Sequence, residues 1–226
     1  MRDRRIPSNP CEATRLPRKT RRQVVPLTVA ELGDLVAALP ERMRGLILFT
    51  AGTGLRQGEA FGLTVDRIDF TARTVQVDRQ LQTITGGDGW EFRPPKTTAS
   101  EQTVPMPKVT MDALRAHLEA FGTGEHGLVF TDAAGEPLRR SSFGQSVWHP
   151  ARKRAGLREG VTFHDLRHFY ASLLIRHGES VKVVQSRLGH ASASETLDTY
   201  SHLWPDSDDT TRAAVDAVMT APPMSA

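Results

Sequence analysis

Residues 162–168 have the sequence Thr-Phe-His-Asp-Leu-Arg-His, and this stretch says most about how the chain folds. In a helix, His164, Arg167 and His168 stand at positions i, i+3 and i+4 and share one face. Apolar residues at helical spacing fill the other side: Phe163, Leu166, Phe169, Leu173 and Leu174. Two histidines and an arginine on one face are costly to bury unless they bind something. We therefore expect a functional helix here, with ordinary helix packing as the alternative, above all for His168.

A second polar stretch lies upstream, where residues 53–59 have the sequence Thr-Gly-Leu-Arg-Gln-Gly-Glu. The glycine turn places Arg56 at the start of a helix, where free N–H groups and the helix dipole favour an anion. The planar guanidinium can bind two oxygens of one phosphate. Glu59 follows three residues later and is placed to orient that guanidinium. Taken alone, the stretch is equally typical of a surface arginine with an ordinary ion pair.

Two further places carry chemistry. Lys96 stands at the polar tip of a predicted hairpin, where a lysine matters only if it reaches a reacting oxygen. The sequence Leu-Gly-His at 188–190 is followed, ten residues after its histidine, by Tyr200. The only other tyrosine, Tyr170, lies in an apolar helix and is expected in the core, whereas Tyr200 has polar neighbours. A tyrosine can attack phosphorus when its oxyanion and the phosphate charge are both stabilised.

These stretches together resemble the catalytic blocks of the tyrosine recombinases, the phage integrase family. The blocks Thr-Gly-Leu-Arg-x-x-Glu, His-x-Leu-Arg-His and Leu-Gly-His…Tyr occur in the family's order, and the resemblance covers about residues 20–205. The residues that match the family's catalytic set are, in chain order, Arg56, Lys96, His164, Arg167, His190 and Tyr200. The resemblance implies an α+β fold, mainly α-helical, with a small antiparallel β-sheet that carries Lys96.

The resemblance also implies an activity, the site-specific recombination of DNA for the integration or excision of a phage or mobile element. Tyr200 would attack a scissile phosphate and form a 3′-phosphotyrosyl link. Arg56 and Arg167 would hold the non-bridging oxygens and compensate the charge of the transition state. Lys96 would protonate the departing 5′-oxygen as general acid.

The same resemblance implies assisting roles for the remaining polar residues. His164 would assist proton transfer at the tyrosine, and His190 would hydrogen-bond a phosphate oxygen. Glu59 and His168 would be supporting residues. No metal, ATP or other cofactor is implied, because cationic side chains neutralise the charge that magnesium often neutralises in phosphoryl transfer.

The resemblance divides the chain into three parts. Residues 1–26 are expected to be a basic linker at the end of an N-terminal core-binding domain that is missing, residues 27–205 the catalytic domain, and residues 206–226 a C-terminal tail. One departure from the family lies after Pro-Lys-Thr, where Ser-x-Arg is usual. Here Ser100 is followed by Glu101-Gln102, so an arginine that contacts phosphate is expected to be missing.

Charge is unevenly distributed along the chain. The net charge is +3, yet residues 1–26 hold eight basic and two acidic side chains, and residues 201–226 carry a net charge of −3. A basic arm on a neutral body suggests a polyanionic partner, with a solvated linker as the alternative. The family implies double-stranded DNA as the partner, a homotetramer on DNA and a monomer when free, with accessory DNA-bending or directionality factors. Alanines and valines within 213–218 would pack the tail on a neighbouring protomer.

The composition excludes several classes of protein. The chain has 226 residues, of which 38% are hydrophobic and 24% charged, an ordinary globular balance that excludes disordered and collagenous proteins. A single cysteine, Cys11, excludes an internal disulfide and a cysteine metal cluster. Neither a signal peptide nor a membrane-spanning run is recognisable. We expect a bacterial cytoplasmic protein associated with the nucleoid.

The spacing of apolar and turn residues predicts the elements. Thr28 and Glu31 have the spacing of a capping box at the start of a helix. A second helix is predicted over 41–49, broken by Gly52-Thr53-Gly54, and a short third helix over 55–63. Short antiparallel strands follow between 65 and 106, with a turn at 86–89. Further helices are predicted at about 110–121, 141–155, 163–177, 180–188, 194–201 and 211–219.

Three other functions remain open from the sequence. A type IB topoisomerase would use the same nucleophile and cations without synapsis. A truncated, catalytically silent fragment of an integrase would bind DNA alone. A zinc hydrolase would use the His-x-x-x-His spacing of His164 and His168, but it needs a third donor and would place Arg167 beside the cation.

Overall fold

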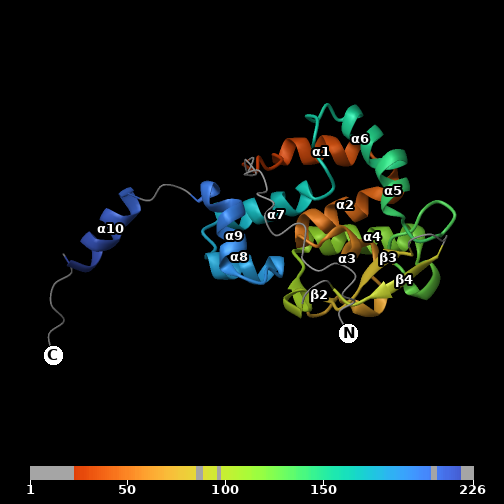
Figure 1. The fold of residues 1–226 in the computed structure, drawn as a ribbon, viewed down its shortest axis with the longest axis horizontal. Helices are drawn as coiled ribbons and strands as arrows, with labels where there is room; N and C mark the ends of the chain where they lie inside the picture. Colours follow the sequence, from red (N-terminus) through yellow and green to blue (C-terminus); the bar gives the residue numbers. More distant parts are fainter. Residues whose placement is uncertain (1–22, 85–88, 96–97, 205–207, 220–226) are drawn as a thin grey trace, which may run out of the picture.

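The computed structural model describes residues 23–84, 89–95, 98–204 and 208–219. Figure 1 shows a helical body with short strands grouped at one side, and α10 standing away from that body. This arrangement confirms the expected α+β fold, mainly helical with a small antiparallel component. No helix of the described residues is long and apolar enough to cross a membrane.

The helices follow the predicted spacing closely. They are α1 (Val29–Ala38), α2 (Glu41–Thr53), α3 (Gln57–Phe61), α4 (Lys108–Phe121), α5 (Arg140–Phe143), α6 (His149–Arg154), α7 (Asp165–Arg176), α8 (Val181–Leu188), α9 (Ala193–Tyr200) and α10 (Asp208–Met219). The helix predicted over 141–155 is present as α5 and α6, joined by a π-helical turn at Gly144–Trp148.

The capping box at the start of α1 is present. The backbone N–H of Glu31 donates to Thr28 Oγ1 at 3.1 Å, and the N–H of Thr28 donates to Glu31 Oε2 at 2.7 Å. The burial of Leu35 and Leu39 then turns the apolar face of α1 toward the core. The start of this helix was therefore predictable from four residues of sequence.

The end of α2 was predicted wrongly. The helix continues beyond Phe49 to Thr53, and Gly54 closes it in the left-handed conformation at φ 68°. Gly52 lies inside the helix and does not end it. A Cβ at this position would lie 1.9 Å from Thr110 Oγ1 on α4, which is too close for any side chain. Glycine is needed at this position for close packing between helices rather than for a turn.

The strands form two small sheets rather than the one expected. Strands β1 (Ile68–Asp69), β2 (Thr74–Val77) and β5 (Gln102–Pro105) make an antiparallel sheet in the order β1-β2-β5. Strands β3 (Gln80–Thr83) and β4 (Trp90–Arg93) pair only with each other. The break between β2 and β3 falls at Asp78, whose carboxylate accepts hydrogen bonds from Arg67 and Arg79.

Two apolar clusters hold the helical body together. The larger surrounds α2 and includes the fully buried Leu46, Ile47 and Phe49. The smaller lies among α7, α8 and α9 and includes Tyr170, whose predicted core position is confirmed. Helix α7 contributes to both clusters, so it fixes the last two helices of the body against the rest.

Gly54 provides a stability test. Its φ of 68° disfavours any side chain, and a Cβ there would lie 2.4 Å from Cδ1 of Tyr170. We expect Gly54→Ala to lower the free energy of unfolding by about 3 kcal/mol, because backbone strain and overpacking add. The measurement is equilibrium urea unfolding.

The matched control is Gly178→Ala. Gly178 also has a positive φ, 81°, but a Cβ at this position would meet no other side chain or backbone segment within 4 Å. We expect a loss of only about 1 kcal/mol there, from the backbone alone. Equal losses at both positions would contradict the proposed contact between residue 54 and Tyr170.

Candidate active site

The polar face of α7 begins with a short hydrogen-bonded turn. Asp165 Oδ2 accepts from the backbone N–H and the hydroxyl of Thr162, at 2.8 and 2.9 Å, which starts the helix at the predicted place. From this start His164 points outward and is exposed, His168 is half-buried, and Arg167 is only 2% exposed. The face predicted from the sequence therefore runs from the solvent-exposed His164 to Arg167, which is buried in the body of the protein.

Arg167 is held by the ends of two other helices. Its Nη1 donates to the carbonyl oxygen of Gly54 at 2.9 Å, and its Nη2 donates to the carbonyl oxygen of Leu188. Gly54 closes α2 and Leu188 ends α8, and carbonyl groups at helix C-termini carry partial negative charge. Burial and the neighbouring Arg56 lower the pKa of Arg167 to about 10, so the guanidinium keeps its charge at neutral pH.

Arg56 lies at the N-cap of α3 and is held as the sequence predicted, by Glu59. Its Nη1 donates to Glu59 Oε1 at 3.0 Å, while Glu59 Oε2 accepts from the backbone N–H of Arg56 at 2.8 Å. The same Nη1 donates to Ser100 Oγ at 2.7 Å, and Nη2 donates to the carbonyl oxygen of Gly189 at 3.1 Å. The Arg56 side chain keeps 30% of its surface exposed, so the guanidinium is both oriented and accessible.

The two arginines are thus anchored to adjacent carbonyl groups, those of Leu188 and Gly189. Gly189 adopts the left-handed conformation at φ 57°, and a Cβ there would lie 3.0 Å from the carbonyl oxygen of Ala99. The turn can therefore pack closely on the segment that follows β4. Lys96 belongs to that segment but lies outside the described residues.

Tyr200 is the last residue of α9 and its side chain points into this region. The sequence predicted polar surroundings near a helix end, but the residue is only 1% exposed and belongs to the smaller apolar cluster. Its hydroxyl lies 2.8 Å from Nδ1 of His168, and its ring stacks on His190 with 6.5 Å between centroids. Burial raises the pKa of Tyr200 to about 12, although Arg167 opposes the shift.

His190 is 8% exposed and has both ring nitrogens near polar groups of α9. Its Nδ1 lies 2.9 Å from Thr196 Oγ1, and its Nε2 lies 3.8 Å from Glu195 Oε1. Burial first, and then Arg167 and Arg56, lower the pKa of His190 to about 3. The ring is therefore neutral near pH 7, and its contact with Glu195 is not an ion pair there.

His164 contacts the rest of the site through His168. The two rings meet edge to face with their centroids 4.8 Å apart. The surrounding protein removes part of the water around the ring, and this desolvation, followed by the effects of His168 and Arg167, lowers the pKa of His164 to about 4. With this pKa, His164 is a neutral imidazole at pH 7. The residue is exposed to solvent and lies at the open side of the site.

The structure brings together all the predicted residues that it describes: Arg56, Glu59, His164, Arg167, His168, His190 and Tyr200. It adds two side chains that sequence reasoning missed. Ser100 was noted only as a departure from a pattern, yet it contacts Arg56. Thr196 precedes Tyr200 by four residues on α9, a helical spacing that could have indicated its position beside His190.

A metal site does not emerge from this arrangement. Among the described residues no group of three or more histidine, cysteine, aspartate or glutamate side chains could hold a metal ion. His168, one of the two histidines of the His-x-x-x-His spacing, directs Nδ1 at the tyrosine. Within the described part of the chain, the third donor that a zinc hydrolase needs is therefore not found.

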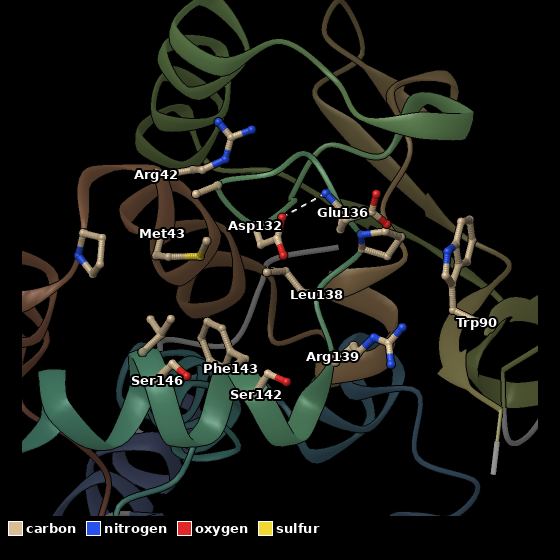
Figure 2. Close-up of a pocket in the computed structure, with 14 residues that line it drawn as sticks. Arg42, Met43, Trp90, Asp132, Glu136, Leu138, Arg139, Ser142, Phe143 and Ser146 are labelled. Carbon is tan, nitrogen blue, oxygen red and sulfur yellow. Dashed lines mark hydrogen bonds between the residues drawn. The ribbon is translucent and has the colours of Figure 1, made fainter. Parts of the chain in front are cut away.

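A separate pocket of about 600 Å³ lies elsewhere on the body (Figure 2). Met43 of α2 and Phe143 of α5 form its apolar wall, and Trp90 of β4 stands at one side. Asp132 shapes the facing loop by accepting the backbone N–H of Glu136 at 2.9 Å. None of the described candidate residues lines this pocket, so the site described above is a different region of the surface.

Known proteins resemble this chain over most of its length. Residues 26–206 match the phage integrase family. The tyrosine recombinase XerC-like protein of Caldanaerobacter subterraneus is 30% identical over 88% of this chain and 57% of its own length. Tyrosine recombinase XerD of Corynebacterium glutamicum is 30% identical over 80% of this chain and 58% of its own length. The chain thus spans less than two thirds of the length of these relatives.

The fold has solved counterparts as well. The Tn1549 transposon integrase, residues 82–397, in complex with circular intermediate DNA, superposes with a TM-score of 0.73 at 24% identity. The match covers 86% of this chain and 67% of that one. This counterpart shows the same fold, and the family match over residues 26–206 shows that the chain belongs to the phage integrase family of tyrosine recombinases.

Proposed function

We propose that this chain is the catalytic domain of a site-specific DNA recombinase that cleaves and rejoins DNA through a covalent 3′-phosphotyrosyl intermediate. The observation that carries the proposal is the contact group around Tyr200: a buried tyrosine that contacts His168 and His190 and lies within the electrostatic reach of the anchored Arg167. The relatives named as tyrosine recombinases support the same activity.

The charges of the site favour a phosphate. Glu59 pairs with Arg56, whereas Arg167 donates hydrogen bonds to the neutral carbonyl groups of Gly54 and Leu188. A buried cation whose hydrogen bonds go to neutral carbonyl groups keeps a preference for an anion. A phosphodiester placed between the two guanidinium groups would supply that anion, and both groups would stabilise its charge in the transition state.

The cleavage step follows from this placement. The Tyr200 hydroxyl oxygen bonds to phosphorus, the bond from phosphorus to the 5′-oxygen breaks, and the tyrosine proton passes to a base. Lys96 is our candidate for the acid that protonates the 5′-oxygen. His190 is our candidate for a hydrogen bond to a phosphate oxygen, donated through Nε2–H while Nδ1 accepts from Thr196.

Double-stranded DNA is the proposed partner. The Tn1549 integrase, a protein of the same fold, was solved in complex with DNA, which supports this choice. The basic residues within 1–26 would add contacts to the phosphate backbone, and such contacts weaken as salt rises.

The domain organisation is part of the proposal. Residues 27–205 form the catalytic domain and residues 206–226 the tail, which contains α10. Val215, Val218 and Met219 of α10 are 50%, 76% and 80% exposed, although all three are apolar. Packing of these side chains on a neighbouring protomer would cover them in a tetramer assembled on DNA.

Covalent trapping tests the nucleophile. The protein is incubated with labelled supercoiled plasmid in EDTA at low salt and quenched with SDS, and DNA linked to protein is counted. We expect adducts from the wild type and none from Tyr200→Phe, because only the hydroxyl is removed. Tyr170→Phe, at the other tyrosine of the chain, is the matched control and should form adducts.

The other outcomes of this assay separate the alternatives. Adducts from Tyr200→Phe would contradict the assignment of the nucleophile. Retention of DNA on a filter without any adduct would favour a silent DNA-binding fragment. Relaxation of the plasmid without strand exchange between two plasmids would favour a topoisomerase-like activity.

The neutral state of His190 has a consequence for acid stability. Its pKa is about 3 in the folded chain, whereas an unfolded histidine has a pKa of about 6.5, so the unfolded chain takes up the proton first. Stability should therefore fall as the pH drops below about 6.5, by up to about 1.4 kcal/mol per pH unit from this group.

The measurement is the free energy of unfolding from pH 7 to pH 4 for the wild type and His190→Asn. Asparagine can still contact Thr196 but does not titrate, so the variant should show the shallower pH dependence. Identical slopes for the two proteins would contradict a buried, neutral His190.

A further inference from the structure

The contact between His168 and Tyr200 has the geometry of a proton-transfer pair. The hydroxyl oxygen and Nδ1 are 2.8 Å apart, a normal hydrogen-bond distance for these atoms. The residues come from different helices, α7 and α9, and their rings meet edge to face with 5.6 Å between centroids. Because Tyr200 is only 1% exposed, bulk water does not compete for its proton.

The charge states of the two groups permit a hydrogen bond from the hydroxyl to the imidazole. Burial raises the pKa of Tyr200, so its hydroxyl keeps a proton at neutral pH. Burial lowers the pKa of His168, so the imidazole is neutral and has one bare nitrogen. In the tautomer that carries the imidazole proton on Nε2, the bare Nδ1 accepts from the phenol hydroxyl.

The other two histidines are less well placed to take this proton. Nδ1 of His190 is occupied by Thr196, and its ring stacks on the tyrosine ring with an angle of 10° between planes. The ring of His164 contacts the ring of His168 at the open side of the site. The sequence resemblance gave the proton-transfer role to His164, whereas the observed hydrogen bond joins the hydroxyl to His168.

We propose that His168 is the general base that accepts the Tyr200 proton during strand cleavage and returns it during rejoining. The inference rests on the proposed function and names a catalytic residue within it. As the tyrosine oxygen bonds to phosphorus, its O–H bond breaks and the proton moves to Nδ1, which makes His168 an imidazolium. The bond to the 5′-oxygen breaks at the same time, and a separate acid supplies that oxygen with its proton.

Neighbouring charges make this transfer reversible. Asp165 on the same helix stabilises the imidazolium, while Arg167 opposes it. His164 and His190, the other titratable groups beside His168, are neutral at pH 7. An imidazolium formed next to Arg167 is therefore a transient species, and it favours return of the proton when the DNA 5′-hydroxyl attacks the phosphotyrosine.

The first test is nuclear magnetic resonance of the free protein, with ¹⁵N-labelled histidine. We expect the His168 signals, identified by their loss in His168→Asn, to show a bare Nδ1 and a protonated Nε2. The Nδ1 signal should shift in Tyr200→Phe, which removes the hydroxyl, and not in Tyr170→Phe. A protonated Nδ1, or a signal that ignores Tyr200→Phe, would overturn the proposal whether or not the protein cleaves DNA.

The second test is the rate of adduct formation as a function of pH. Asparagine at position 168 keeps an acceptor near Nδ1 but cannot take the proton, so His168→Asn should react about 10²–10⁴-fold more slowly at pH 7.5. Its rate should rise about tenfold per pH unit, because the tyrosine must then ionise unaided. DNA retention on a filter should not change.

The matched control is His177→Asn, at an exposed position at the end of the same helix, which should react like the wild type. A His168→Asn enzyme with the wild-type rate and pH profile would overturn the proposal. A slow variant with the wild-type pH profile would do so as well, because it would indicate a structural role only. Failure of the wild type itself to form adducts would count against the proposed function, while the resonance experiment would still judge the histidine–tyrosine pair.

Discussion

The organisation of the site depends on the burial of one positive charge, that of Arg167. The guanidinium is nearly inaccessible to water, and it is stabilised by carbonyl oxygens at the C-terminal ends of α2 and α8. Such a charge is tolerated only where its donors meet acceptors in good geometry. The two helices and α7 must therefore keep their relative positions for the fold to be stable.

Several features of the chain follow from this constraint. Gly54 adopts the left-handed conformation that ends α2 with its carbonyl toward Arg167, and Gly189 adopts the same conformation at the end of α8, directly after the Leu188 carbonyl that accepts from Arg167. The carbonyl of Gly189 in turn orients Arg56, which Glu59 holds from the other side. Burial first, and then the nearby Arg167, lower the pKa values of the neighbouring histidines, and a neutral His168 can accept a hydrogen bond from Tyr200.

Much of the fold could be predicted from sequence, because local signals control it. The capping box at Thr28 and the apolar spacing of α7 need only neighbouring residues. The end of α2 was predicted wrongly because Gly52 was read as a helix breaker. Glycine is required there by the close approach of Thr110, which is distant in sequence and so absent from any local pattern. The separation of β3 and β4 from the other strands falls at Asp78, which binds Arg67 from outside the strands, a contact that strand propensity does not contain.

In the site, too, local features could be predicted from the sequence and long-range contacts could not. Charged residues in motifs could be identified individually, but the sequence does not say which histidine meets the tyrosine hydroxyl. His168 and Tyr200 are separated by a helix and two turns, so only the packing of α7 against α8 and α9 brings them to 2.8 Å. Carbonyl partners such as Leu188 are invisible to motif reasoning, because every residue has a carbonyl group.

We propose that the anchored arginines hold a DNA phosphate where the Tyr200 oxygen attacks it. Mass spectrometry of the protein–DNA adduct, after digestion with nuclease and protease, measures this most directly. We expect a nucleotide joined through its 3′-phosphate to the peptide that contains Tyr200. A nucleotide on the Tyr170 peptide, on a serine, or joined through a 5′-phosphate would contradict it.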